Sequence, residues 1–203
     1  MLSPRTRRLM LDHDILRQRF SNWPLIQMTG TAGMPPEVYR FTYRVKGLYV
    51  SANGEILERE VHLLEVNLSL GYPRRAPQCR MIAPVFHPNF DENVVCIGDF
   101  WAASEGLDDL IIRIGRMIAY QEYNTKSPLN GLAAKWAEQH AHLLPIDPRS
   151  VAPPSVDAIQ QQSAIPAGGE SANVAGPGEK IPEAQSPLPQ KIVIEPSDTN
   201  QNP

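Results

Sequence analysis

Aromatic residues are absent from the C-terminal part of this chain, which limits how much of it can fold. The 203 residues include 5 Phe, 6 Tyr and 3 Trp, and none lies beyond Trp136. Residues 145–203 hold 11 of the 20 prolines, with seven acidic and three basic residues. A segment so poor in large apolar side chains cannot bury enough surface to offset the conformational entropy lost on folding. We therefore predict a folded domain at residues 1–144 and a disordered, proline-rich, acidic tail at residues 145–203, in which KIVIEP (191–196) is either plain linker or a short docking strand.

The chain also lacks a strong charge of one sign and any long apolar run. Residues 1–144 carry 16 basic and 15 acidic side chains, whereas nucleic-acid binding needs a concentrated basic face. No apolar run approaches the length of a membrane span, and the N-terminus has no signal-peptide apolar core. We expect no nucleic-acid partner, no membrane attachment and a cytoplasmic location. The two cysteines, Cys79 and Cys96, are then expected to be free thiols.

The first half of the chain predicts a helix followed by antiparallel strands. PRTRRLMLDHDILRQRF (4–20) repeats apolar residues at helical spacing, with Ser3 as its cap and Pro4 in the first turn. EVYRFTYRV (37–45) alternates apolar and polar residues, as a half-buried strand does. An Asn-Gly turn in SANGE (51–55) follows, and a second alternation places Leu64, Val66, Leu68 and Leu70 on one face. With QCRMI (78–82) as a further strand, we expect an antiparallel meander of about four strands.

The second half of the chain changes to helical periodicity. Apolar residues from Leu107 to Ile118 form one stripe, and Asp108 and Asp109 lie in the first turn, where acidic residues favour a helix. A second helix is predicted to begin with Ser127 as its cap and Pro128 as its first residue. Its expected buried face consists of Leu129, Leu132, Ala133 and Trp136. The order of elements indicates an α+β fold, with the helices segregated against a sheet.

Between the strands and these helices lies FHPNFDENVVCIGDFW (86–101), with a His-Pro-Asn triplet seven residues before a cysteine. The longer stretch YPRRAPQCRMIAPVFHPNFDENVVCIGDFW (72–101) resembles the core of the ubiquitin-conjugating enzymes. YNTKSPLNGLAAKW (123–136) is similar to the segment that these enzymes place before a C-terminal helix. The resemblance covers residues 3–144 and implies the fold of that family: an N-terminal helix, a β-meander, an active-site loop and C-terminal helices.

The resemblance implies that Cys96 is the nucleophile of an acyltransferase. Members of the family receive a ubiquitin-like protein as a thioester and pass it to an amine, usually lysine, or to a thiol. No His pairs with Cys96 in a protease-like dyad, and exchange between thioesters is nearly balanced in energy, so such a base is not required. Asn89 either stabilises the oxyanion through its amide N–H or only bonds the loop together. His87 and Pro88 are interpreted as supports of the same loop.

Several residues depart from the family pattern. The loop from Asn89 to Cys96 is one residue short, and Asp91 and Glu92 stand where a Gly is usual. Many members carry an acidic residue at the gateway position before the Pro-Leu pair, where it would deprotonate or orient the incoming lysine. This chain has Ser127 there, and Asp99 or Asp91 is the candidate substitute. These departures indicate a divergent branch, for which a bacterial origin is one interpretation.

The expected partners are ubiquitin or a ubiquitin-like protein, its activating enzyme, and a ligase or substrate protein. Arg5, Arg7 and Arg8 either face the activating enzyme or form a solvated basic surface. Arg74 takes the place of an aromatic residue that contacts ligases in many members.

The cysteines and the fold allow two other interpretations. Cys79, His87 and Cys96 fit no common zinc spacing, so no metal and no cofactor is expected. Cys79 is interpreted as a small buried residue of a strand. The serious alternative is a non-catalytic module with the same fold, which binds a ubiquitin-like protein or its conjugation machinery.

Overall fold

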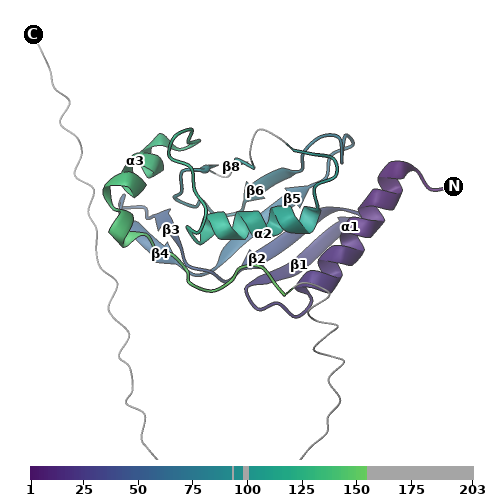
Figure 1. Ribbon diagram of the computed structural model, residues 1–203, viewed down its shortest axis with the longest axis horizontal. Coiled ribbons are helices and arrows are strands. Elements are labelled where there is room, and N and C mark those ends of the chain that lie inside the picture. The colour runs from purple at the N-terminus through teal and green to yellow at the C-terminus, as the bar shows by residue number, and fades with distance from the viewer. Residues whose placement is uncertain (93, 98–100, 155–203) are drawn as a thin grey trace, which may run out of the picture. The chain divides into compact units, whose positions relative to one another are not determined.

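A computed structural model describes residues 1–92, 94–97 and 101–154 (Figure 1). The helices are α1 (Pro4–Phe20), α2 (Leu107–Ile118) and α3 (Gly131–Gln139), followed by a 3-10 turn at Ala141–Leu143. The longer strands are β1 (Ile26–Gly33), β2 (Pro36–Tyr43), β5 (His62–Asn67) and β6 (Gln78–Met81). The shorter ones are β3 (Gly47–Val50), β4 (Ile56–Arg59), β7 (Phe90–Asp91) and β8 (Val94–Val95). The tail predicted to be disordered lies outside the described residues from position 155 onward, as does Asp99.

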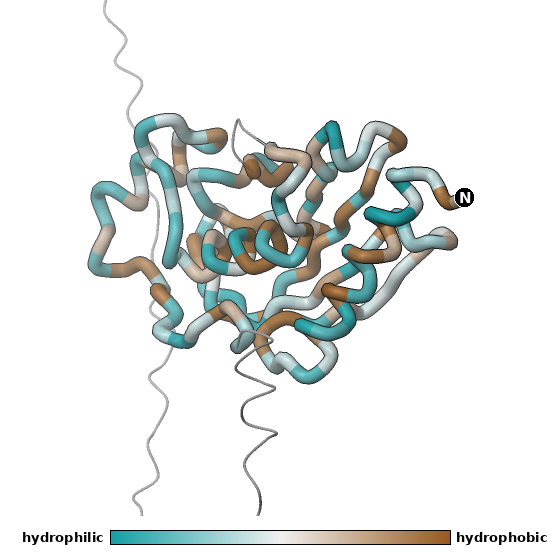
Figure 2. The backbone as a smooth tube through the Cα atoms, turned by 45° about the vertical axis from the view of Figure 1, so that its right-hand side comes forward, coloured by the Kyte–Doolittle hydropathy of each residue, from teal (hydrophilic) through white to brown (hydrophobic). Residues whose placement is uncertain are grey.

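Helix α1 begins where the sequence predicts. The hydroxyl of Ser3 accepts a hydrogen bond from the backbone N–H of Thr6 at 3.0 Å, and Pro4 occupies the first turn. The N–H groups of the first helical turn have no partner within the helix. Ser3 accepts from one of them, and Pro4 has no N–H that would need a partner. In Figure 2 the helix alternates between hydrophobic and hydrophilic segments, and its buried apolar residues are Leu9, Leu16 and Phe20.

The main sheet is antiparallel, in the order β1-β2-β5-β6-β8-β7. The alternation in β2 is confirmed, because Tyr39, Phe41 and Tyr43 are fully buried. Phe41 lies opposite Leu64, which in turn lies opposite Met81, so one face of three strands forms a continuous apolar layer. The α+β fold with an N-terminal helix, an antiparallel sheet and C-terminal helices is therefore confirmed.

Two details of the strand prediction were wrong. The main sheet of the described residues has six strands, and three of them, β1, β7 and β8, were not predicted. The sequence of β1, IQMTGTAG, alternates only weakly because two of the positions in step with Ile26 are Gly30 and Ala32, and the strand fully buries only Ile26. Leu70 is 87% exposed because β5 ends at Asn67 and the chain turns at residues 69–75.

Helix α2 packs against the buried face of the sheet, and Figure 1 shows it crossing in front of the strands. Leu110, Ile111 and Ile114 have no exposed surface, as the predicted stripe requires. The hydroxyl of Tyr43 donates to the carbonyl of Ile111 at 2.9 Å, which ties the centre of β2 to the middle of the helix. Together with α1 these elements enclose the main core.

Helix α3 starts later than predicted. Asn130, not Ser127, is the cap, and its side-chain oxygen accepts from the N–H of Ala133 at 3.0 Å. The N–H groups of Leu129 and Asn130 both donate to the carbonyl of Pro88, which holds this segment outside the helix. Consequently Leu129 and Leu132 are 42% and 78% exposed instead of buried.

Helix α3 and the β3–β4 hairpin share a second, smaller core. Its buried members are Leu48, Ile56, Phe86, Tyr120, Ala133, Trp136 and Ala137. The Asn-Gly turn predicted in this hairpin is present, with Gly54 at a φ of 80° and Ser51 donating its N–H to the carbonyl of Glu55.

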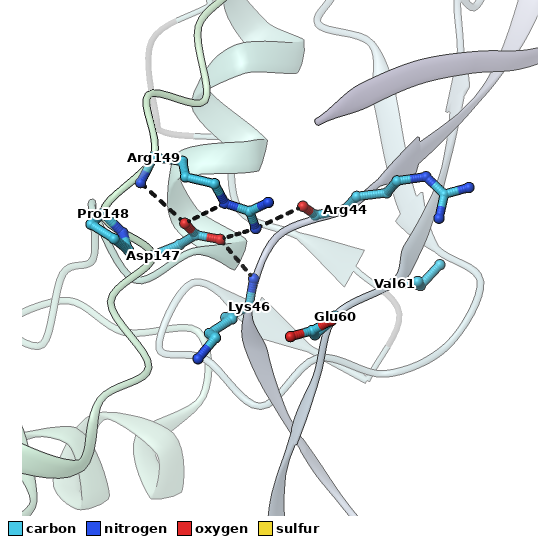
Figure 3. A pocket seen from close by; sticks show the side chains of 7 residues that line it. All are labelled: Arg44, Lys46, Glu60, Val61, Asp147, Pro148 and Arg149. Carbon is cyan, nitrogen blue, oxygen red and sulfur yellow. Dashed lines mark hydrogen bonds and ion pairs between the residues drawn. The ribbon is translucent and has the colours of Figure 1, made fainter. Parts of the chain in front are cut away.

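The packed part of the chain continues beyond Leu144. Val151 is 1% exposed within the main core, and its carbonyl accepts from the indole N–H of Trp23 at 2.8 Å. Asp147 is held by the guanidinium of Arg149 and the backbone N–H of Lys46 (Figure 3). Arg149 also donates to the carbonyl of Arg44 at 3.0 Å. Residues 145–153 therefore belong to the folded domain, and the boundary placed at Leu144 from composition lies too early.

No helix among the described residues combines the length and the apolar character needed to cross a bilayer.

Candidate active site

A short hairpin brings Cys96 back to the His-Pro-Asn triplet. The backbone N–H of Cys96 donates to the carbonyl of Asn89 at 2.9 Å, and β7 pairs with β8 through Phe90 opposite Val95. The chain reverses at Glu92, whose φ of 45° lies in the left-handed region that favours glycine. The seven-residue spacing between Asn89 and Cys96 thus closes a tight turn, although the glycine that is usual in the family is missing.

The two cysteines have different surroundings. Cys79 is buried in β6 opposite Val66, and burial raises the pKa of its thiol to about 12. Because the thiolate is the reactive form, Cys79 is unsuited to nucleophilic attack. Cys96 is partly exposed at the end of the hairpin. Of the two thiols, Cys96 is therefore the one that a macromolecular partner can reach.

Asn89 is held at both its backbone and its side chain. Its backbone carbonyl accepts from Cys96, and its Oδ1 accepts from the backbone N–H of Asn124 at 3.0 Å. These contacts account for the loop-bonding role expected of this residue. Among the residues that the structure describes, these contacts engage the oxygen atoms of Asn89 and leave its side-chain amide N–H groups without a partner.

His87 lies inside the protein and supports the loop. Its ring is fully buried and packs edge-on against Phe90 and Tyr120, with ring centroids 5.0 and 4.7 Å apart. Its Nδ1 accepts from the backbone N–H of Asn89 at 3.0 Å. Burial lowers the pKa of His87 to about 3, so the ring is neutral near pH 7. This geometry fits a structural support and offers no route for proton transfer to solvent.

Pro88 connects the triplet to the start of α3. The side chain is buried, and the carbonyl accepts from Leu129 and Asn130 at 2.9 and 3.0 Å. Since this carbonyl receives two donors, the triplet and the α3 cap are fixed to one another.

Asn124 is a site residue that sequence reasoning missed. Besides donating to Asn89, it accepts from the backbone N–H groups of Lys126 and Ser127 through its own Oδ1, at 2.9 and 3.3 Å. An Asn that bonds the backbone two or three residues later is a common turn former, and the polar run NTKS contained that signal. Asn124 therefore places exposed Ser127, the expected gateway residue, on a loop bonded to the triplet.

The acidic residues proposed to replace a gateway carboxylate are only partly defined. Asp91 is exposed on β7 opposite Val94. Asp99 lies outside the described residues. Among the described residues no group of three or more His, Cys, Asp or Glu side chains is arranged to hold a metal.

The arginines expected to meet partners differ in their contacts. Arg5 donates to Glu37 at 2.8 Å and to the carbonyls of Leu68 and Ser69. Arg8 is likewise engaged within the domain. Arg7 is exposed, and its side chain donates to the carbonyl of Leu2, near its own end of the helix. Arg74 is exposed in the turn after Tyr72. Arg7 and Arg74 are thus available to a partner, whereas Arg5 and Arg8 are committed to contacts within the chain.

One hollow of the described residues lies away from this loop. Its volume is about 470 Å³, and it is lined by Arg44, Lys46, Glu60, Val61, Asp147, Pro148 and Arg149 (Figure 3). None of these residues belongs to the triplet or the hairpin of Cys96. Cys96 therefore lies on a surface hairpin outside this hollow.

Comparison with known families agrees with this arrangement. A family model described as "Ubiquitin-conjugating enzyme" matches residues 27–143. The match includes the main sheet, the triplet, Cys96 and all of α2 and α3, and it begins after α1.

Proposed function

Because the chain belongs to the ubiquitin-conjugating enzyme family, we propose that Cys96 carries ubiquitin or a ubiquitin-like protein as a thioester. The observation that carries the proposal is the partly exposed thiol of Cys96, bonded through its backbone to Asn89 of the His-Pro-Asn triplet. The other cysteine, Cys79, is buried, and the pKa of its thiol is raised, so it does not compete for the acyl group.

Loading is an exchange between two thioesters. The thiolate of Cys96 attacks the carbonyl carbon that joins the modifier to the activating enzyme. A new carbon–sulfur bond forms, the old one breaks, and the activating enzyme's cysteine leaves as a thiolate that takes up a proton. Since one thioester replaces another, little driving force is needed beyond positioning of the two thiols.

Discharge transfers the acyl group to an amine or to a second thiol. A deprotonated lysine attacks the same carbonyl carbon, the carbon–sulfur bond breaks, and Cys96 leaves as a thiolate. The attacking nitrogen gives up one proton to solvent as the amide bond forms. Negative charge develops on the carbonyl oxygen during this step, and a neutral N–H donor beside it lowers the barrier. Asn89 supplies that donor in our proposal, since its oxygen atoms are already bonded to Cys96 and Asn124.

The partners in this scheme are an activating enzyme, the modifier, and a ligase or substrate protein, in the cytoplasm. Arg7 and Arg74 are the exposed basic residues that we assign to partner contacts. Ser127 takes the gateway position without a carboxylate, so the acceptor amine must lose its proton by another route, for which Asp91 is the candidate among the described residues.

The test is a loading assay with ATP, an activating enzyme and the modifier, resolved on a non-reducing gel. An adduct that disappears on addition of thiol is expected for the natural chain and for Cys79→Ala, and none for Cys96→Ala. A thiol-sensitive adduct that persists in Cys96→Ala would refute the assignment. Binding of the modifier without any adduct would instead favour the non-catalytic module.

A further inference from the structure

Tyr120 follows helix α2 in a conformation that usually belongs to glycine. Its φ is 54°, in the left-handed region, and the residue is 1% exposed. The N–H of Tyr120 donates to the carbonyl of Met117, and the N–H of Gln121 donates to the carbonyl of Arg116, both at 2.9 Å. This pair of bonds is the Schellman ending of a helix, in which glycine is the usual residue. The chain therefore holds a bulky side chain at a position where its backbone is strained.

The hydroxyl of Tyr120 reaches the residue that precedes the His-Pro-Asn triplet. It donates a hydrogen bond to the backbone carbonyl of Phe86. The N–H of Phe86 donates in turn to the carbonyl of Leu48 in β3, at 2.8 Å. Both backbone groups of Phe86 are thus bonded, so the chain enters the triplet from a fixed residue.

The ring of Tyr120 packs against the triplet itself. It lies edge-on to the ring of His87, with the centroids 4.7 Å apart and the planes at 62°. Nδ1 of His87 accepts from the N–H of Asn89, whose carbonyl accepts from the N–H of Cys96. Described contacts therefore run without a gap from Tyr120, through His87 and Asn89, to the residue that carries the reactive thiol.

We propose that Tyr120 is a positioning residue that sets the place of Asn89 beside Cys96. It does so by fixing the ring of His87 and the carbonyl of Phe86. The role rests on the proposed function of Cys96. Strained residues persist where the surrounding structure holds them, and they concentrate at functional sites. Glycine would end the helix with less strain, but it would make neither of the two contacts of Tyr120.

The variant Tyr120→Phe tests this role, and Tyr43→Phe is its matched control. Each variant keeps the ring and removes one buried hydroxyl that donates to a backbone carbonyl, that of Phe86 for Tyr120 and that of Ile111 for Tyr43. Both should lower the melting temperature to a similar extent, because each leaves a carbonyl without this donor. Tyr43 belongs to the main core and Tyr120 to the smaller one, so only Tyr120→Phe should disturb the triplet.

Two readings at the triplet separate positioning from stability without any partner protein. Hydrogen exchange followed by NMR should be about fivefold faster at the amides of Asn89 and Cys96 in Tyr120→Phe, beyond any acceleration common to all amides. The amide proton of Asn89 should also shift upfield, because its bond to His87 lengthens. Tyr43→Phe should show neither change.

Single-turnover assays supply the third reading. Discharge to lysine should slow by about tenfold in Tyr120→Phe, because the N–H donor of Asn89 is displaced from the oxyanion. Loading should change less, and Tyr43→Phe should leave both rates at those of the natural chain.

Three results would overturn the proposal. They are equal changes in the two variants, unaltered amides of Asn89 and Cys96 in Tyr120→Phe, and altered amides without slower discharge. If the natural chain forms no thioester, the proposed function fails, and the two amide readings alone decide whether Tyr120 holds the triplet.

Discussion

The backbone N–H of Asn124 donates to Oδ1 of Asn89 at 3.0 Å, so the side-chain oxygen of this residue bonds the triplet to a second loop. This relationship permits the two roles of Asn89 to be separated by substitution. An aspartate retains the oxygen that accepts from Asn124 but removes the N–H donor. An alanine removes both.

Asn89→Asp should therefore keep the loop folded and lose the oxyanion donor. We expect discharge to lysine to slow by about 100- to 1000-fold, the range found when one such donor is removed. Loading should change much less, because exchange between thiols depends less on that donor. Single-turnover rates of the two half-reactions provide the measurement, and Asn89→Ala serves as the variant that also loses the bond to Asn124. Equal losses of both rates in Asn89→Asp would show that Asn89 acts only through the loop.

Glu92→Gly should stabilise the domain. Glu92 has a φ of 45°, a conformation that costs a non-glycine residue about 1–2 kcal/mol. Glycine adopts it freely but loses more chain entropy on folding, so the expected net gain is about 0.5–1 kcal/mol. Urea unfolding measures the change, with Glu92→Ala as a control that keeps the strain. A lower midpoint for Glu92→Gly would mean that the carboxylate itself makes a stabilising contact.

Two truncated chains test whether residues 145–153 stabilise the domain. A chain of residues 1–154 should unfold at the same temperature as the full chain, since the buried residues that we describe all lie within it. A chain of residues 1–144 should be less stable by about 2–4 kcal/mol, because it loses the buried Val151 and the hydrogen bond to Trp23. Equal melting of the two truncated chains would show that residues 145–153 contribute nothing to stability.

Acid should destabilise the domain through its buried histidines. His62 is 2% exposed, and burial lowers its pKa to about 4, although its ring is bonded to the carbonyl of Arg59. Between about pH 6.5 and pH 4 the unfolded chain therefore holds more protons than the folded one, so stability falls as the pH falls. His87 acts in the same direction, with a pKa of about 3.

Replacing His62 by Gln should remove part of this slope. Melting temperatures measured from pH 7 to pH 4.5 should fall less steeply in His62→Gln than in the natural chain, by roughly 5 °C over the range. His142 is exposed, so His142→Gln is the matched control and should leave the slope unchanged. Parallel curves for all three chains would contradict the assigned role of His62.

The helices and strands in which apolar residues recur at a regular spacing were predictable from the sequence. Tyr39, Phe41 and Tyr43 alternate with polar residues, and the apolar stripe of α2 repeats at helical spacing, because each element buries one face. Strand β1 escaped prediction because it lies at the edge of the sheet and buries little. The start of α3 was misplaced because Pro88, far away in sequence, holds Leu129 and Asn130 outside the helix.

The site was predictable where it depends on a linear motif. The nearness of Cys96 to Asn89 follows from the triplet and its spacing, and the hairpin supports it. The inward direction of Arg8 was not predictable, because its partners at Ala103 and Glu105 are known only once α1 and the post-hairpin segment are folded together. Asn124 was missed for the same reason, since its bond to Asn89 joins two loops.

The triplet also lies on the boundary between the two cores. Phe86, just before it, belongs to the smaller core with α3, whereas Phe90, just after it, belongs to the main core beneath α2. The chain thus passes from one hydrophobic core to the other within the triplet that precedes Cys96. A substitution in the buried face of α3 is therefore expected to disturb the triplet from the side of Phe86 and to leave the main core intact.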